Sequence, residues 1–202
     1  MSTSARRTQA DRSAATRAAL IAAARRLFAE HGYADVGTER IVQAAGVTRG
    51  ALYHQFAGGK VELFVAVLEE VEAELMGRLT DLITTVPSGD VRELLLVGAE
   101  AWLDASTEPE VQRIVLLDGP SVLGWERWRE IGLRYGLGLV TAVLADAVSI
   151  GAIPSQPVDP LAHALLGALD EAALYVARSA DPVTARAEMG AVVDRLVRGL
   201  LA

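Results

Sequence analysis

Apolar residues recur at helical spacing along most of the chain. A first stripe ends at Gly32 and consists of Leu20, Ala24, Leu27 and Phe28. A longer stripe runs from residue 59 to about Thr80 and contains Leu63, Phe64, Val67, Leu68, Val71, Leu75 and Leu79, with Glu69, Glu70, Glu72 and Glu74 on the opposite side. Steps of three and four place such residues on one face of an α-helix, so both stretches are predicted to be amphipathic helices with one buried side.

The second half of the chain continues this pattern between breaks that contain Pro or Gly. These breaks lie at 87–90, 119–120 and 151–160, where Pro lacks an amide donor and Gly loses more conformational entropy than other residues. Helices are predicted between them at 91–105, 108–118, 125–149, 161–176 and 182–200. The pattern therefore predicts an all-α fold of about nine helices.

Residues 38–60 are predicted to form two helices joined by a tight turn, with a helix-turn-helix over about residues 37–56. Gly46 stands where the first helix must end in a left-handed turn, a conformation that is costly for a residue with a side chain. Thr48 offers its hydroxyl oxygen to the free amides that open the second helix. The inner side of the first helix is predicted to carry Ile41, Ala44 and Ala45.

The second of these helices has distinct inner and outer sides. Leu52 and Phe56 lie four residues apart and are predicted to face the core, which leaves an outer side without Asp or Glu. Such a short helix suits the DNA major groove, where an arginine can donate to two guanine acceptors at once. The candidate DNA-binding residues are Thr38, Arg40, Thr48, Arg49, Gly50, Tyr53, His54 and Lys60.

This stretch resembles the DNA-binding domain of TetR-family transcriptional regulators over roughly residues 14–64. The resemblance rests on Ile41, the Ala45-Gly46-Val47-Thr48 run, Leu52-Tyr53, Phe56, Lys60 and Leu63. It implies that the second helix enters the major groove, that Lys60 holds a phosphate, and that the chain dimerises through its last two long helices. The Ala57-Gly58-Gly59 turn is one residue longer than the family pattern.

Charge is unevenly distributed along the chain. Residues 1–60 hold nine Arg or Lys against four Asp or Glu, and residues 61–202 hold ten against 22, which gives the stated net charge of −7. A basic N-terminal part suits DNA although the whole chain is acidic, while a surface that is lopsided by chance is the alternative. We therefore divide the chain into a flexible basic arm at 1–12, a DNA-binding domain at 13–60, and an effector-binding and dimerisation domain at 61–202.

All three tryptophans lie in the middle of the chain, near three glycines inside one predicted helix. Gly132, Gly136 and Gly138 would together cost about 3 kcal/mol relative to alanine, which indicates that a neighbouring helix or a ligand uses the space. Aromatic residues at helical spacing more often fill a core, but indoles also line apolar pockets for flat organic molecules. The candidate effector-binding residues are Trp102, Trp125, Trp128 and Tyr135.

The last two predicted helices carry Ala-rich apolar stripes. Two such antiparallel helices look like half of a four-helix bundle, which a two-fold dimer would complete. Burial within a single subunit is the alternative. The candidate dimerisation residues are Leu161, Leu165, Ala168, Leu169, Ala172, Val193, Leu196 and Leu200.

Together these features predict a ligand-responsive DNA-binding regulator. We expect a repressor that binds a palindromic operator as a homodimer and is released by a small organic effector. The alternative is an all-helical ligand-binding protein or enzyme that does not use its helix-turn-helix on DNA. Because His31, His54 and His163 lie on different helices without a paired carboxylate or nucleophile, we expect no enzyme activity, and no metal or cofactor.

The chain's location is also predicted from what it lacks. There is no cysteine, which excludes disulfides and thiolate metal sites. The N-terminus has no apolar run typical of a signal, and no stretch approaches the roughly 18 uninterrupted apolar residues of a membrane span. We expect a cytoplasmic protein with no membrane partner.

Overall fold

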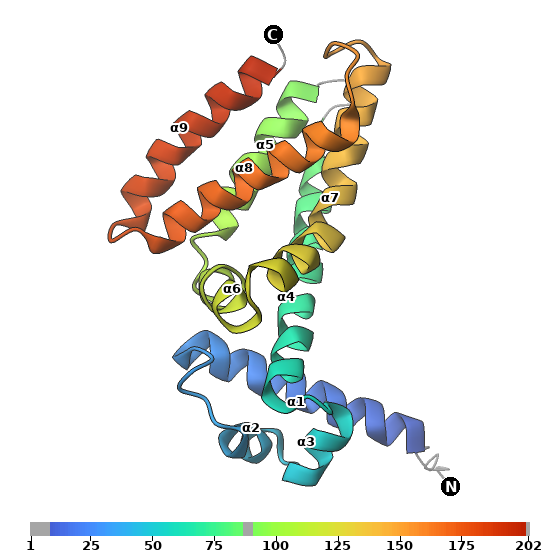
Figure 1. The fold of residues 1–202 in the computed structure, drawn as a ribbon, viewed down its shortest axis with the longest axis vertical. Coiled ribbons are helices and arrows are strands. Elements are labelled where there is room, and N and C mark those ends of the chain that lie inside the picture. The colour runs from blue at the N-terminus through green and yellow to red at the C-terminus, as the bar shows by residue number, and fades with distance from the viewer. Residues whose placement is uncertain (1–8, 87–90, 201–202) are drawn as a thin grey trace, which may run out of the picture. The chain divides into compact units, whose positions relative to one another are not determined.

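The computed structural model describes residues 9–86 and 91–200, and it is helical with no strand in those ranges (Figure 1). The helices are α1 (Gln9–His31), α2 (Thr38–Ala45), α3 (Arg49–Gln55), α4 (Gly59–Ile83), α5 (Val91–Ala105), η1 (Val111–Asp118), α6 (Gly119–Leu123), α7 (Trp125–Ser149), α8 (Val158–Arg178) and α9 (Pro182–Leu200). The predicted all-α class is confirmed.

The chain forms two compact units, residues 1–70 and 71–202, and α4 contributes to both. The division falls ten residues after the predicted domain boundary at residue 60 because the first turns of α4 complete the core of the first unit. Phe64 on α4 packs edge-on against Phe28 and Tyr33, with ring centroids 5.5 Å and 5.2 Å apart.

Helix α1 begins earlier than predicted. It starts at Gln9, so residues 9–12 of the predicted arm are helical, and the rest of that arm lies outside the described residues. Within this first part of the helix, the Thr16 hydroxyl donates a hydrogen bond to the Arg12 carbonyl at 2.9 Å. The prediction started this helix at Ser13, where the apolar pattern begins. The structure starts it earlier because a helix end that is exposed to solvent does not need apolar residues.

The turn between α2 and α3 is confirmed in detail. Gly46 has φ +66° and ψ 31°, and its amide caps the end of α2. The Thr48 hydroxyl oxygen accepts a hydrogen bond from the Ala51 amide at 3.2 Å. On α2, however, Val42 is buried beside Ile41 and Ala44 is exposed, so the predicted inner side was rotated by part of a turn.

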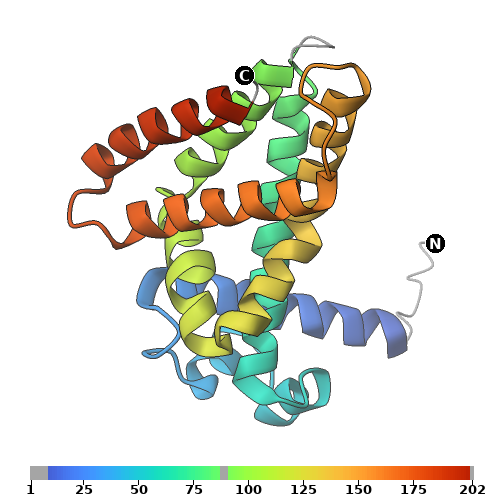
Figure 2. The same ribbon diagram turned by 45° about the horizontal axis from the view of Figure 1, so that its top comes forward.

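The second unit is built from packed helices. Helices α8 and α9 lie side by side (Figures 1 and 2), and α5 and α7 both contact α8. By length and composition alone α7 would also suit a membrane span. In the structure its buried residues, Trp128, Ile131, Gly136, Leu144 and Ala147, face the interior of this unit.

The predicted helix end at Asp118 is confirmed, but the break expected at Gly119-Pro120 is absent because another helix follows directly. A π-type segment, η1, runs to Asp118, and α6 continues from Gly119 with Pro120 in its first turn, where the missing amide breaks no hydrogen bond. Gly119 is required for another reason. A Cβ at this position would lie 2.7 Å from Cδ1 of Trp128, whose indole nitrogen donates to the Val115 carbonyl at 2.8 Å.

Replacing Thr48 by Ala is expected to destabilise the protein by about 1 kcal/mol, because the Ala51 amide loses its side-chain acceptor at an exposed helix start. Chemical denaturation measures the change in the free energy of unfolding. Thr48→Ser is the matched control, since it keeps a hydroxyl and should lose much less. Equal losses for both variants would contradict the capping role.

Candidate functional site

Helix α3 presents a defined set of side chains to solvent. Arg49, Gly50, Tyr53 and His54 are all exposed, as predicted, and Tyr53 keeps 43% of its surface accessible. The Arg49 guanidinium lies 5.8 Å from the centre of the Tyr53 ring. A hydrogen bond to the Tyr53 side chain raises the pKa of Arg49 further, so this exposed side chain is a constant positive charge.

The opposite side of α3 fixes its orientation. Leu52 and Phe56 are fully buried, and the guanidinium of Arg17 on α1 lies 4.5 Å from the centre of the Phe56 ring. Gln55 donates from its side-chain nitrogen to the Ser13 hydroxyl at 2.8 Å. The outward residues are therefore carried by a helix that is anchored along its inner side, as a reader of a groove requires.

Gly50 has no packing role in this unit. The only atom within 4 Å of a Cβ placed there is the Thr48 hydroxyl oxygen, at 3.9 Å. Packing within the described residues therefore does not require a glycine at this position.

The remaining candidate DNA-binding residues lie on neighbouring elements. Thr38 opens α2, and the exposed Arg40 places Nη2 2.7 Å from Nε2 of His31. Lys60 is half-buried in the first turn of α4. Its ammonium donates to the Tyr33 carbonyl at 2.5 Å and sits 3.8 Å from the centre of the Tyr33 ring. The ammonium group of Lys60, which was predicted to hold a phosphate, therefore contacts Tyr33 of its own unit in this structure.

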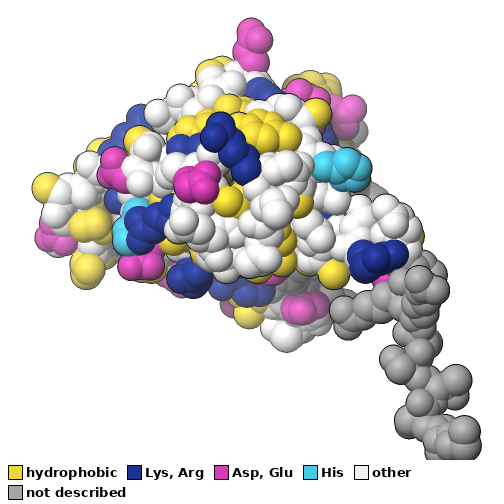
Figure 3. Space-filling view, turned by 90° about the horizontal axis from the view of Figure 1, so that it is seen from below, with side chains coloured by type: hydrophobic (Ala, Val, Ile, Leu, Met, Phe, Trp, Pro, Cys, Tyr) yellow, Lys and Arg dark blue, Asp and Glu magenta, His cyan; other side chains and the backbone are white. Residues whose placement is uncertain are grey.

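Basic charge does not cover the molecule evenly on the side that includes α2 and α3. In Figure 3 the Lys, Arg and His side chains are interspersed with uncharged and acidic ones. Glu39 on α2, for example, is exposed and close enough to contribute to the electrostatics of Arg49. This side therefore presents individual basic residues and no broad positive field.

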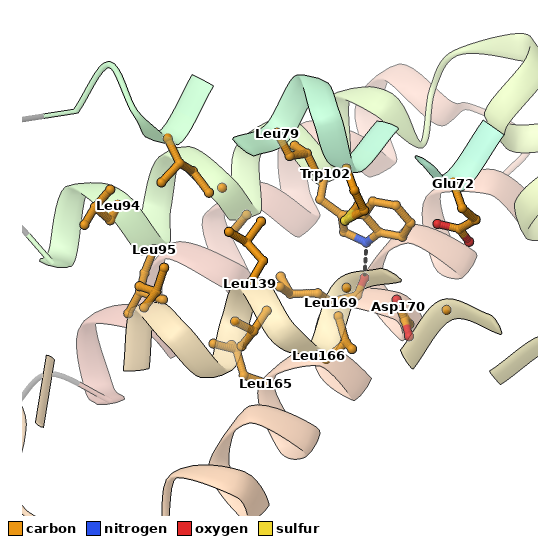
Figure 4. A pocket seen from close by; sticks show the side chains of 18 of the residues that line it. Glu72, Leu79, Leu94, Leu95, Trp102, Leu139, Leu165, Leu166, Leu169 and Asp170 are labelled. Atoms are coloured by element: carbon orange, nitrogen blue, oxygen red, sulfur yellow. Dashed lines mark hydrogen bonds between the residues drawn. The ribbon is translucent and has the colours of Figure 1, made fainter. Parts of the chain in front are cut away.

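A second candidate site is an apolar cavity of about 90 Å³ within residues 71–202 (Figure 4). Its wall is formed by side chains from α4, α5, η1, α7, α8 and α9. Most are aliphatic, and they include Leu79, Leu94, Leu95, Leu139, Leu165, Leu166 and Leu169. An apolar space with few polar groups is typical of a small-molecule site.

Two of the four predicted effector-binding residues line this cavity. Trp102 and Trp128 are buried in its wall, and the Trp102 indole nitrogen donates to the Leu169 carbonyl at 3.0 Å, which fixes the ring (Figure 4). Trp125 and Tyr135 are not among its lining residues. Trp125 is 58% exposed, and its ring contacts that of Trp128 at a tilt of 50°, with the ring centroids 5.1 Å apart.

The glycines of α7 serve two purposes. Gly132 lines the cavity, and a Cβ there would meet no atom within 4 Å, so the glycine keeps cavity space open. At Gly136 a Cβ would lie 3.4 Å from Leu166 on α8, which makes this glycine part of a close contact between helices. Gly138 is exposed and does neither. The sequence left both uses open, and the structure contains both.

Three charged residues at one end of the cavity were not predicted. Glu72 was expected on the solvent side of α4, but it is only 5% exposed and lines the cavity together with Asp170 and Arg129. Arg129 pairs with Asp170 through Nη1 and Oδ2. Burial raises the pKa of Glu72 to about 7, with Asp170 adding to the effect, and burial raises the pKa of Asp170 to about 6 against the opposing influence of Arg129.

The predicted dimer residues divide between the interior and the surface. Leu169, Ala172 and Val193 are buried within the unit, so these three are not surface contacts and that part of the prediction was wrong. Leu165 is half-buried and lines the cavity. Leu161 is half-buried, Ala168 and Leu196 are exposed, and the side chain of Leu200 lies outside the described residues. Ala164 on α8 is exposed too, and exposed residues that the prediction missed on these helices are Tyr175 on α8 and Val192 on α9.

A three-helix unit that exposes an anchored α3 in this way belongs to the class of helix-turn-helix DNA-binding transcriptional regulators. Residues 20–67 match the family described as bacterial regulatory proteins, tetR family, and residues 92–200 match the tetracyclin repressor-like C-terminal domain. The chain belongs to the TetR family of transcriptional regulators.

Individual relatives support this assignment. A crystal structure of a TetR-family regulator from Pectobacterium atrosepticum superimposes with a TM-score of 0.85 at 35% identity, and the match covers 97% of this chain and 98% of that one. The regulator CymR of Pseudomonas putida is 36% identical over 115 residues, 56% of each chain. The repressor AcnR of Corynebacterium efficiens is 40% identical over 65 residues, 32% of this chain and 34% of its own. The chain thus spans about a third to about half of these curated relatives.

The buried carboxyl of Glu72 makes stability depend on pH. Its pKa rises from 4.5 to about 7 on folding, so the folded state binds the proton more tightly, and the stabilisation present below about pH 4.5 is lost as pH rises toward 7. The loss is on the order of 3 kcal/mol. Glu72→Gln should therefore show a smaller decline in the free energy of unfolding between these pH values, measured by denaturation. Parallel pH profiles for the two proteins would contradict this.

Proposed function

We propose that the chain is a ligand-responsive repressor that binds a palindromic operator as a homodimer in the cytoplasm. The observation that carries the proposal is the composition of α3: Arg49, Gly50, Tyr53 and His54 project outward while Leu52 and Phe56 anchor the helix from within. Arg49 would read base edges in the major groove, and Tyr53 and His54 would contact phosphates or neighbouring bases.

The homodimer part of the proposal rests on the two last helices. One α3 makes few contacts, whereas two copies held about 34 Å apart meet successive major grooves on one side of a duplex. Helices α8 and α9 carry exposed apolar residues that nothing in the described chain covers: Tyr175 is 52%, Val192 39% and Leu196 55% exposed. Ala164 and Ala168 are exposed on α8, and their small side chains would allow another helix to approach closely. This surface would therefore pair with the same surface of a second copy.

The ligand-responsive part rests on the cavity and on α4. Glu72, Met76 and Leu79 of α4 line the cavity, and the same helix begins at Gly59 beside the DNA-binding unit. A ligand that favours one packing of α4 would alter the separation of the two α3 helices in a dimer. Ligand and operator would then oppose each other with the same coupling free energy, typically about 1–3 kcal/mol. A non-DNA role for the helix-turn-helix would leave the exposed Arg49 and Gly50 without a purpose.

Arg49→Ala is expected to weaken binding to the operator by about 1–3 kcal/mol and to relax the choice of one base pair in each half-site. Fluorescence anisotropy with the DNA upstream of the protein's own gene, and with single-base variants of it, measures both effects. Arg49→Lys is the matched control because it keeps the charge and loses the two-pronged geometry. It should retain salt-dependent affinity and still lose the base preference.

Wild-type binding should also weaken steeply between low and physiological salt, since phosphate contacts release counterions. Binding that ignores salt, or an Arg49→Ala variant that keeps its full base preference, would refute the DNA-reading role of α3.

Leu196→Glu is expected to convert the dimer to a monomer, because it places a charge in the centre of a proposed apolar interface. Sedimentation velocity gives the oligomeric state. Ile150→Glu is the control, since Ile150 is similarly exposed, at 52%, but lies outside α8 and α9. A wild-type protein that is monomeric, or a Leu196→Glu variant that remains dimeric, would refute this interface.

A further inference from the structure

The carboxyl group of Glu72 is buried and has no hydrogen-bond or ion-pair partner among the described residues. Glu72 is 5% exposed, and no side chain or backbone group among the described residues forms a hydrogen bond or ion pair with it. Every fully enclosed side-chain nitrogen or oxygen in that part of the chain does have a partner. Since Glu72 has none, its oxygens face open space, and the space that Glu72 lines is the cavity.

The surroundings of Glu72 leave this end of the cavity short of positive charge. Figure 4 shows Glu72 and Asp170 at one end of the cavity, and Leu94 and Leu95 toward the other. The charged lining residues are Glu72 from α4, Arg129 from α7 and Asp170 from α8. Arg129 is already paired with Asp170. One guanidinium therefore stands against two carboxyl groups and pairs with only one of them, and a buried carboxylate without a partner is costly.

We propose that the ligand of this cavity is a molecule with an apolar body and a protonated amine or similar cationic head, and that the head binds the carboxylate of Glu72. The inference rests on the proposed ligand-responsive function and adds the chemical class of the ligand. The aliphatic and indole side chains of the wall take the body, and Glu72 selects the charge of the head. An anionic head at the same place would meet an excess of carboxylates and is excluded.

The cavity volume of about 90 Å³ indicates a slim body. An engineered protein cavity of about 150 Å³ holds one benzene molecule, so this smaller space favours a slim unbranched alkyl chain over a ring, and a long chain has to displace side chains of the wall. Gly132 borders open cavity space, and any side chain at this position projects into it.

The test compares three probes that share one hydrocarbon chain: octylamine, octan-1-ol and octanoate. Each is titrated into the full chain without DNA, at about pH 8.5 where Glu72 is charged, with heat or the fluorescence of Trp102 and Trp128 as the signal. Octylamine is expected to bind roughly tenfold or more tightly than octanoate. Octanoate binding as well as octylamine, or no binding of any probe, overturns the proposal.

Variants separate charge recognition from apolar burial. Glu72→Gln keeps the size and removes the charge, so it should lower the affinity for octylamine roughly tenfold and leave that for octan-1-ol nearly unchanged. Glu74→Gln makes the same change at an exposed position two residues away and should alter nothing. Gly132→Leu should weaken all three probes alike by filling the cavity. Equal effects of Glu72→Gln and Glu74→Gln overturn the proposal, and the ranking of probes on the wild-type chain decides it if Glu72→Gln does not fold.

The outcome is distinguishable from failure of the proposed function. Operator affinity is measured separately by anisotropy, with and without octylamine. An operator complex that forms while the probes show no preference for a cation overturns the ligand class and leaves DNA binding standing. Preferential binding of octylamine that leaves operator affinity unchanged supports the ligand class and refutes ligand response as part of the function.

Discussion

Helix α4 has to complete two hydrophobic cores, and the organisation of the chain depends on this constraint. Its first turns bury Leu63 and Phe64 against the aromatic residues of the DNA-binding unit. Its later turns bury Leu75 and Leu79 in the other unit, where Leu79 also forms part of the cavity wall. Each core therefore contains apolar side chains from the same helix. A regulator can use such a helix to couple two activities.

The DNA-binding unit shows how few residues are needed to position a reading helix. A left-handed glycine ends α2, a threonine hydroxyl opens α3, and two large apolar side chains anchor its inner side. Arg49, Gly50, Tyr53 and His54 on the outward face are exposed and take no part in this buried core. Separation of anchoring from reading lets a family keep one scaffold and change its operator by substituting the outward residues. Lys60 differs, because its ammonium is held by Tyr33.

The other unit combines an apolar interior with an uncompensated carboxyl group. Such a combination is unfavourable in an empty core, because desolvation raises the free energy of the ionised form and nothing in the described chain repays it. It becomes favourable when something else supplies the missing positive charge. In the proposed complex, a cationic ligand would offset the desolvation cost of the ionised Glu72 carboxyl, and the cavity would therefore select for positive charge. The glycines of α7 act in the same direction, since one keeps the space open and another lets α7 and α8 approach closely enough to enclose it.

By itself the sequence determined the helices, the glycine turn, the threonine cap and the two sides of α3, because these depend on periodicity and on local backbone preferences. It also predicted that Trp102 and Trp128 line an apolar pocket, and both line the cavity. Only the tertiary structure decided which face of a long helix is covered. Glu72 lies in a run of glutamates that local pattern assigns to solvent, and Leu165, Leu169, Ala172 and Val193 share a stripe with exposed neighbours. In both cases burial is set by packing against helices that are distant in sequence. The local pattern of residues holds no information about where those helices lie. For the same reason the close packing of Gly119 against the indole of Trp128 could not be read from the local pattern, which indicated only a break there.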